Sequence, residues 1–225
     1  MLDHDRIRAW VFDLDDTLYL ERNYVLSGFA AVGEWLAEVR GIPGFAAAAA
    51  ARFEHGARGN IFDLAFADLG VPRSENLVAE LVSRYRKHPP QIALADDAAR
   101  FLGRLIPSRK VAIISDGPID SQIRKVQALA LDAIACPIVL TDRWGPGFSK
   151  PHERAFLEVQ ETLGCAASAC VYVGDNPVKD FAAPHALGWQ TLRVRRPEAL
   201  HSGVATRRGE VSCEVASLDD LPARI

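Results

Sequence analysis

Residues 7–20 read IRAWVFDLDDTLYL, and this stretch indicates both a fold and a chemistry. A short apolar run over residues 7–12 predicts a buried strand, which ends at the acidic cluster that begins with Asp13. Asp13 and Asp15 are two residues apart, so their side chains point the same way in an extended backbone. Two carboxylates about 4 Å apart repel by about 4 kcal/mol at an effective dielectric of about 20. A fold tolerates such a pair if a cation bridges it or if one carboxyl is protonated, and both arrangements are useful in catalysis.

The acidic cluster by itself does not identify a site. For an Asp-x-Asp pair alone, an acidic turn that closes a strand is the more frequent structure. A calcium-binding EF-hand loop is excluded, because it needs glycine where Leu18 stands and a bidentate glutamate where Tyr24 stands. The choice between a turn and a site therefore depends on what the rest of the chain places beside these carboxylates.

The segment after the first strand carries a helical pattern. Apolar side chains recur three to four residues apart from Val25 to Val39, which predicts an amphipathic helix. Three further helices are expected over residues 43–58, 61–69 and 74–86. Ser74 is the expected N-cap of the last one, and Pro89 and Pro90 end the pattern.

Beyond residue 94 short apolar strands alternate with helices. The strands are expected over residues 111–114, 138–140, 169–173 and 190–194, and the helices over residues 118–130, 152–163 and 178–187. This alternation predicts the α/β class, with a parallel sheet and right-handed crossovers. We therefore expect an α/β core made of residues 1–20 and 92–225, with an all-helical domain of residues 21–91 inserted after the first strand.

Polar clusters follow the predicted strands, and ligands of parallel sheets bind outside the carboxyl ends of the strands. Residues 115–117, Ser-Asp-Gly, offer a hydroxyl and free backbone N–H groups at the start of a helix, which is a cradle for phosphate. Asp175 and Asp180 flank a strand-to-helix turn and offer oxygen ligands to a hard cation. Lys150 follows a glycine-rich loop and precedes a helix, which would hold its charge at the edge of the sheet.

Each of these clusters is weak evidence by itself. Ser-Asp-Gly is also an ordinary turn, and a lone lysine such as Lys150 is most often a solvated surface residue. The case for a site comes from their order, because an acidic pair, a hydroxyl, a lysine and a second acidic pair are complementary and all fall at one edge of a single sheet.

This order, with FDLDDTLY at residues 12–19 and VGDNPVKD at residues 173–180, resembles the haloacid dehalogenase-like (HAD) superfamily. The resemblance covers most of the chain outside the helical insertion. It implies a Rossmann-like parallel-sheet core (the HAD fold), and it makes the insertion a helical cap of the C1 type. It also implies Mg²⁺ as the cofactor.

The resemblance further implies a role for each matching residue. Asp13 resembles the nucleophile and Asp15 the general acid/base. Ser115 and Lys150 match the phosphate-binding hydroxyl and the lysine that stabilises charge. The implied metal-binding residues are Asp13, Asp15 through its backbone carbonyl, Asp175, and Asp180 as a supporting acid. Asp116 belongs to the phosphate-binding segment, but many relatives have asparagine there and its negative charge leaves its role unassigned.

The chemistry that these residues permit is phosphoryl transfer from a small phosphomonoester through an aspartyl-phosphate. A protonated Asp15 would donate to the leaving oxygen, whereas a halide leaving group needs no acid, so a phosphatase is favoured over a dehalogenase. A phosphomutase would share all these residues. A non-catalytic scaffold and a phospho-accepting receiver are weaker alternatives. A sugar phosphate, a nucleotide or a similar metabolite remains open as the substrate.

The helical insertion is expected to act as a lid that excludes solvent and contributes specificity. Tyr24, His55, Arg58 and Asn60 lie near predicted helix ends and are candidates for substrate contacts. Surface and helix-capping roles account for each of them equally well.

Composition limits the remaining function classes. The chain has 225 residues, a formal net charge of −3, 49% apolar and 24% charged residues, which fits a globular protein without a nucleic-acid surface. The only basic cluster, expected to be solvated, comprises Arg193, Arg195, Arg196, Arg207 and Arg208. Four cysteines without C-x-x-C spacing and the lack of a signal-like or membrane-spanning segment favour a cytoplasmic protein with reduced thiols. A monomer or a homodimer is expected.

Overall fold

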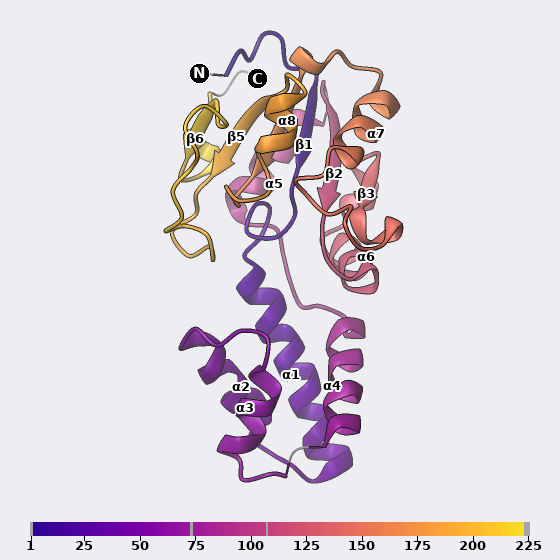
Figure 1. Cartoon of the computed structure of the whole chain (residues 1–225), viewed down its shortest axis with the longest axis vertical. Helices are drawn as coiled ribbons and strands as arrows, with labels where there is room; N and C mark the ends of the chain where they lie inside the picture. Colours follow the sequence, from indigo (N-terminus) through magenta and orange to yellow (C-terminus); the bar gives the residue numbers. More distant parts are fainter. Residues whose placement is uncertain (1, 73, 107, 223–225) are drawn as a thin grey trace. The chain divides into compact units, whose positions relative to one another are not determined.

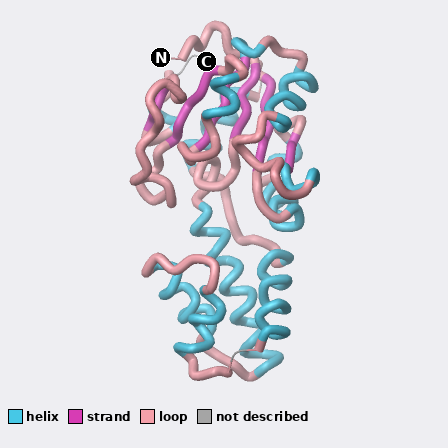
Figure 2. Tube along the Cα trace, in the orientation of Figure 1, coloured by secondary structure: helices cyan, strands magenta, loops and turns pink. Residues whose placement is uncertain are grey.

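A computed structural model describes residues 2–72, 74–106 and 108–222 of the chain (Figure 1). The chain forms two compact units, one made of Met1–Glu21 with Ala93–Ile225 and the other of Arg22–Ile92. Each boundary lies one residue further along the chain than the boundary expected from the sequence pattern. The first unit contains the sheet and the second is helical (Figure 2).

The α/β unit is built on one six-stranded sheet with the order β3-β2-β1-β4-β5-β6, and every neighbouring pair is parallel. The strands are β1 (Ala9–Phe12), β2 (Lys110–Ser115), β3 (Ile138–Leu140), β4 (Cys170–Gly174), β5 (Gln190–Val194) and β6 (Cys213–Val215). The predicted α/β class with a parallel, Rossmann-like sheet is confirmed. Because β1 lies between β2 and β4, the residues that follow these three strands emerge at one edge.

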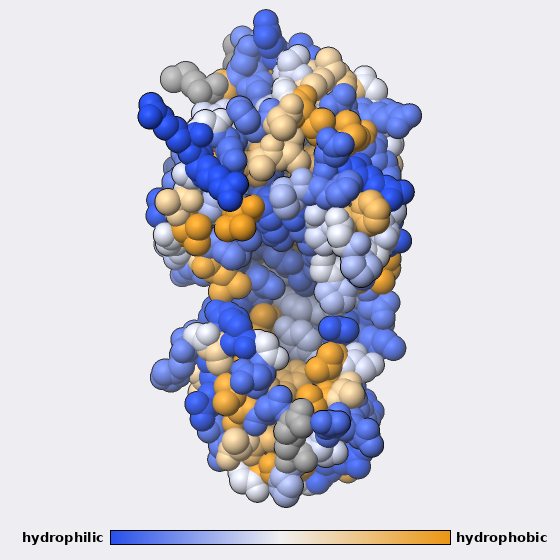
Figure 3. All heavy atoms as spheres, in the orientation of Figure 1, coloured by the Kyte–Doolittle hydropathy of each residue, from blue (hydrophilic) through white to orange (hydrophobic). Residues whose placement is uncertain are grey.

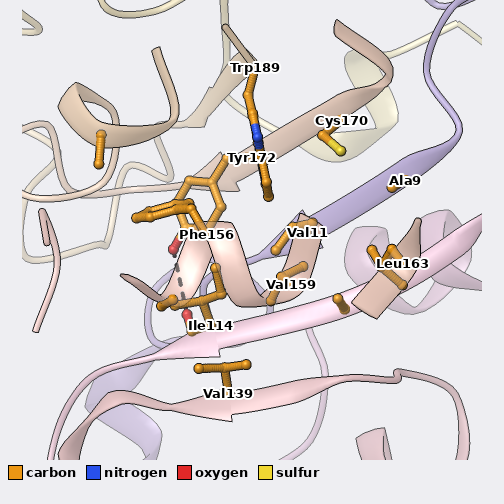
Figure 4. Packing of buried hydrophobic residues seen from close by; sticks show 13 residues of the cluster. Ala9, Val11, Ile114, Val139, Phe156, Val159, Leu163, Cys170, Tyr172 and Trp189 are labelled. Carbon is orange, nitrogen blue, oxygen red and sulfur yellow. Dashed lines mark hydrogen bonds between the residues drawn. The ribbon is translucent and has the colours of Figure 1, made fainter. Parts of the chain in front are cut away.

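Helices cover both faces of this sheet, as expected for strands that are apolar along their whole length. They are α5 (Asp96–Leu105), α6 (Ile119–Ala128), α7 (Arg154–Leu163) and α8 (Ala182–Ala186). On one face Phe156 of α7 packs against Tyr172 with ring centroids 5.0 Å apart (Figure 4). On the other face Phe101 of α5 meets the ring of Trp10 at 5.0 Å. The sheet is therefore the buried middle layer that fixes where each strand ends.

The helix expected over residues 178–187 is wrong in its first half, because α8 begins only at Ala182. The preceding residues form a turn held by side chains. Asp180 Oδ2 accepts from the Asn176 N–H at 2.9 Å, and Asn176 Oδ1 accepts from the Val178 N–H at 3.0 Å. Short polar side chains that bond to nearby backbone N–H groups compete with helix formation. Periodicity alone does not show this competition.

The helical unit has a core of its own. Its helices are α1 (Glu21–Arg40), α2 (Phe45–Glu54), α3 (Ile61–Asp68) and α4 (Glu75–Lys87). Phe29, Phe45 and Leu81 are among the buried residues around which these helices pack. Ser74 caps α4 as predicted, because its Oγ accepts from the Leu77 N–H at 3.4 Å. None of the described helices is both long enough and apolar enough to cross a membrane.

The basic cluster is where the sequence-based expectation is most clearly wrong. Arg193 and Arg196 are buried, with 1% and 9% of their surface exposed, whereas the side chain of Arg195 is 45% exposed. Arg196 pairs with both carboxylate oxygens of Asp97 at 2.9 Å, and Arg193 lies 3.3 Å from Glu214. Acidic partners make burial of these guanidinium groups tolerable, and composition does not show where such partners lie.

Figure 3 shows the hydropathy of the side chains on one face of the molecule. Hydrophilic side chains dominate this face, and hydrophobic ones gather in separated patches. Cys136, Cys165, Cys170 and Cys213 are all free thiols, in agreement with the absence of C-x-x-C spacing.

Candidate active site

Three buried acids meet at the carboxyl edge of the sheet. Asp13 follows β1, Asp175 follows β4, and Asp180 lies in the turn before α8. One carboxylate oxygen of each lies within 4.8 Å of the other two. Gly174 makes room for this cluster, because a Cβ there would lie 2.5 Å from Asp180 Oδ2. The sequence-predicted acids are thus together in the structure, although they come from segments far apart in the chain.

Lys150 is the cation of this cluster. Its Nζ lies 2.5 Å from Asp13 Oδ1 and 2.8 Å from Asp180 Oδ1, and it donates to the hydroxyl of Tyr172 at 2.8 Å. The side chain is fully buried. Burial opposes its charge, but the attraction of Asp13 and Asp180 outweighs burial and holds the pKa of Lys150 well above its ordinary value. The lysine is therefore a permanent positive charge beside Asp13.

Lys150, with Lys179 as a second cation that acts on Asp13, does not balance the charge of the three acids. Burial, and then repulsion from Asp13 and Asp180, raises the pKa of Asp175 from 3.8 to about 9. Burial raises the pKa of Asp13 to about 6 despite the opposing attraction of Lys150. Asp175 Oδ2 is buried and has no hydrogen-bond partner among the described residues. A hard divalent cation bound by carboxylate oxygens would relieve this repulsion, so the donor set fits Mg²⁺.

Ser115 and Asp116 lie beside the acids at the end of β2. Ser115 Oγ donates to Gln122 Oε1 at 3.0 Å. The Asp116 carboxylate accepts from the Lys150 backbone N–H at 3.1 Å and from the Thr141 hydroxyl at 2.7 Å. Burial opposes its charge, but Lys150 and other donors outweigh burial and lower the pKa of Asp116. Asp116 thus ties the loop of Lys150 to the end of β2.

Asp15 has partners of its own, separate from the group of Asp13, Asp175 and Asp180. Its carboxylate oxygens lie 2.7 and 2.9 Å from Lys125 Nζ, and they accept from the Tyr19 hydroxyl and from Gln122 Nε2. Burial opposes ionisation, but Lys125 outweighs it and lowers the pKa of Asp15, so the structure favours the ionised form over the expected protonated one. The physical reason is the cation of Lys125 on α6, which the sequence pattern did not place next to Asp15.

The helical candidates have contacts within their own unit. The Tyr24 ring is buried and lies 5.6 Å from that of Tyr85. His55 Nδ1 lies 2.7 Å from the Ala51 carbonyl oxygen, and the Arg58 guanidinium donates to the Phe53 carbonyl. Asn60 precedes α3 without a side-chain cap. These contacts give capping and packing roles to three of the four residues.

Sequence interpretation missed several residues of the site. Gln122 and Lys125 are three apart and buried on one face of α6, so helical periodicity applied to polar residues would have drawn attention to them. Lys179 stands inside the quoted VGDNPVKD segment, and its Nζ lies 3.3 Å from Asp116 Oδ2. Tyr172 reads as an ordinary strand residue, and nothing in the sequence shows that its hydroxyl reaches Lys150.

Two arginine side chains that donate to backbone carbonyl oxygens of the acidic segments were also not recognised from the sequence. Arg193 Nε donates to the Asp175 backbone carbonyl oxygen at 3.1 Å. Arg196 donates to the Thr17 carbonyl oxygen through two nitrogens, at 2.8 and 3.2 Å. Two arginines from the end of β5 thus hold the backbone of both acidic motifs.

The sheet and its edge place the chain in the class of α/β proteins with a Rossmann-like fold and an inserted helical unit. The sequence model of the haloacid dehalogenase-like hydrolases matches residues 7–188. The chain belongs to this family of hydrolases.

Two curated relatives carry a more specific name. A glyceraldehyde 3-phosphate phosphatase of Methanopyrus kandleri is 27% identical over 139 residues, which cover 60% of this chain and 58% of that protein. A glyceraldehyde 3-phosphate phosphatase of Methanocaldococcus jannaschii is 31% identical over 85 residues, 38% of this chain and 36% of that protein. The chain thus aligns with less than two thirds of the length of either relative.

Solved structures agree on the fold. A 2-haloacid dehalogenase from Pseudomonas syringae pv. Tomato superposes with a TM-score of 0.64 at 23% identity, covering 96% of both chains. A HAD phosphatase from Thermococcus onnurineus superposes with a TM-score of 0.61 at 21% identity, covering 95% of both chains. Because dehalogenases and phosphatases fit almost equally well, the fold does not decide between the two chemistries.

Proposed function

We propose that this protein is a Mg²⁺-dependent phosphatase that hydrolyses a small phosphomonoester through an aspartyl-phosphate on Asp13. The observation that carries the proposal is the buried contact between Asp13 and Lys150 Nζ beside Asp175 and Asp180. It combines a carboxylate nucleophile, a fixed positive charge and oxygen ligands for a cation in one place.

The first step is attack of an Asp13 carboxylate oxygen on phosphorus, which forms the acyl phosphate as the bond to the leaving oxygen breaks. Lys150 and the Ser115 hydroxyl bind the phosphoryl oxygens and stabilise their charge. Asp13, Asp175 and Asp180, with the Asp15 backbone carbonyl, would hold Mg²⁺. When bound, Mg²⁺ supplies positive charge that offsets the repulsion between the nucleophile and the phosphate.

Asp15 serves both halves of the reaction. Lys125 favours the ionised form in the free protein, so the first half requires that Asp15 takes up a proton as the substrate binds. Asp15 then donates this proton to the leaving oxygen, and the resulting carboxylate takes a proton from the water that hydrolyses the acyl phosphate. The ion pair with Lys125 suits the second half, since it favours the ionised form. Asp116 supports the loop of Lys150 in this proposal and does not bind phosphate itself, because its negative charge is already engaged.

The substrate class that we propose is a sugar phosphate, with glyceraldehyde 3-phosphate as the first compound to test. The names of the two curated relatives support this choice. Nucleotides come second. In this proposal the helical unit is a C1-type cap. The protein is a monomer or homodimer in the cytoplasm, and it acts on a free metabolite and not on a nucleic acid. The alternatives are a phosphomutase, a non-catalytic scaffold and, because of the structural likeness, a 2-haloacid dehalogenase.

The test is phosphate release from p-nitrophenyl phosphate and glyceraldehyde 3-phosphate, with Mg²⁺ and with EDTA. We expect Mg²⁺-dependent release that Asp13→Asn abolishes while its circular dichroism stays that of the wild type. Halide release from 2-chloropropionate is measured in parallel. An Asp13→Asn protein as active as the wild type, or release of halide without release of phosphate, contradicts the proposal. Isomerised sugar phosphate without free phosphate would identify a mutase.

A further inference from the structure

Helix α6 presents two buried polar side chains to the candidate site. Lys125 and Gln122 are 3% and 2% exposed and lie on the same face of the helix. Gln122 accepts from Ser115 Oγ at 3.0 Å and donates to Asp15 Oδ2 at 3.4 Å. Lys125 Nζ contacts both carboxylate oxygens of Asp15. One rigid helix therefore holds both the phosphate-binding hydroxyl and Asp15.

From this geometry we infer that Lys125 is a positioning residue for Asp15, an inference that rests on the proposed phosphatase function. Two contacts to one carboxylate fix its orientation better than one contact would. The third donor, the Tyr19 hydroxyl, comes from the same segment as Asp15 itself, so α6 provides the anchor that is independent of that segment. The nucleophilic carboxylate of Asp13 pairs with Lys150 instead, so each of the two acids has a lysine of its own.

A purely structural role is the competing account of this ion pair. Replacing both partners of a buried ion pair with apolar side chains is often neutral or stabilising, whereas removing one partner destabilises the fold. The ion pair of Lys125 therefore does not by itself distinguish a structural role from a positioning role. Asp15 is also less buried than its partner, because its side chain is 21% exposed while that of Lys125 is 3% exposed. A carboxylate that three donors hold and that stays partly exposed can exchange a proton with a substrate.

The positioning role and the structural role differ in their dependence on the leaving group. An alkyl phosphate leaves as an alkoxide and needs the proton from Asp15, whereas 2,4-dinitrophenolate leaves without one. A residue that acts through Asp15 must therefore affect alkyl esters much more than activated aryl esters. Loss of structure would affect both kinds of ester equally.

The experiment compares Lys125→Met, Asp15→Asn, their double variant and the wild type in the full-length, Mg²⁺-loaded protein. The alkyl esters are glyceraldehyde 3-phosphate and glycerol 3-phosphate, and the activated ester is 2,4-dinitrophenyl phosphate. Positioned general acid–base groups contribute about 10²–10⁴-fold, so we expect Lys125→Met to lower the ratio of alkyl to activated kcat/KM about tenfold to a hundredfold. In the Asp15→Asn background the same substitution should change that ratio less than about twofold.

Arg124→Met is the matched control, because Arg124 is the neighbouring cation on α6 and is more exposed than Lys125. It should leave the ratio unchanged. If circular dichroism shows that Lys125→Met does not fold, Lys125→Arg replaces it. The arginine guanidinium can still contact the Asp15 carboxylate, so the ratio of alkyl to activated kcat/KM should fall only in part.

Each of the remaining outcomes overturns a definite statement. Equal losses on both kinds of ester, an undiminished effect in the Asp15→Asn background, or faster alkyl hydrolysis in Lys125→Met each contradict positioning by Lys125 while leaving the phosphatase proposal intact. A wild type inactive on all three esters overturns the proposed function, and the inference with it.

Discussion

Binding of Mg²⁺ should release a proton from Asp175 in the neutral pH range. Burial and the neighbouring acids raise the pKa of Asp175 to about 9, so at pH 7 its carboxyl is protonated before a cation binds. A carboxylate ligand must be ionised, and cation binding therefore competes with that proton. If one proton is released per ion, the apparent affinity for Mg²⁺ rises about tenfold, or about 1.4 kcal/mol, for each unit by which the pH increases towards the pKa.

The sign of the effect on stability is opposite without the cation. A carboxyl whose pKa is raised on folding favours the neutral form, so the metal-free protein loses stability as the pH rises from about 4 towards about 9. Added Mg²⁺ should reverse this trend. The stabilisation follows from mass action and reaches about 2.7 kcal/mol at a cation concentration of about 100 times Kd.

The assay is isothermal titration calorimetry with Mg²⁺ at pH 6.5, 7.5 and 8.5, in two buffers whose ionisation enthalpies differ. We expect about one proton released per ion and an apparent Kd that falls about a hundredfold across this range. Asp175→Asn mimics the neutral carboxyl and should neither bind the ion tightly nor release the proton. A Kd that is independent of pH, or a wild type that the ion does not stabilise, would refute the electrostatic reasoning.

Two further predictions concern single contacts. Tyr172→Phe removes one oxygen contact of Lys150 and should lower kcat about tenfold, because a hydrogen bond to a charged group contributes about 1.5–3 kcal/mol. Steady-state kinetics on p-nitrophenyl phosphate tests this, with a melting curve as the control for folding. An unchanged kcat contradicts the prediction. Gly28→Ala places a Cβ 2.3 Å from the Tyr85 ring and should destabilise the protein by about 1–3 kcal/mol in urea, whereas Gly103→Ala meets nothing within 4 Å and should be neutral or stabilising. Equal midpoints for the two glycine variants would show that this packing does not matter.

The parallel sheet was predictable because its strands are apolar on both faces and alternate with helices. The strands over residues 138–140 and 190–194 were predicted to the residue. The edge strand β6 was not predicted, since its three residues Cys-Glu-Val are partly exposed and carry no apolar run. The helix α5 likewise went unrecognised among residues 94–110.

Asp13 and Asp175 could be predicted because each directly follows a strand, where topology alone brings residues together. Lys150 and Asp180 could be predicted because they lie in the connections that precede α7 and α8, at the same edge of the sheet. The partners of Asp15 could not be predicted in the same way. Its orientation depends on Lys125, whose position on α6 relative to β1 is a matter of packing between elements. Arg193 was misjudged for the same reason, since its acidic partner Glu214 lies on the unpredicted strand β6.

The two buried arginines have a consequence for making hybrids of related enzymes. Arg193 and Arg196 lie beyond residue 188, where the match to the family's sequence model ends, yet they donate to the backbone of Asp175 and Thr17. A hybrid that takes its C-terminal segment from another family member would keep every motif residue. It would nevertheless replace the two arginines that donate to the backbone of these motifs. Transplanting activity between relatives at this junction therefore requires matching the acceptors of these two side chains as well as the motifs.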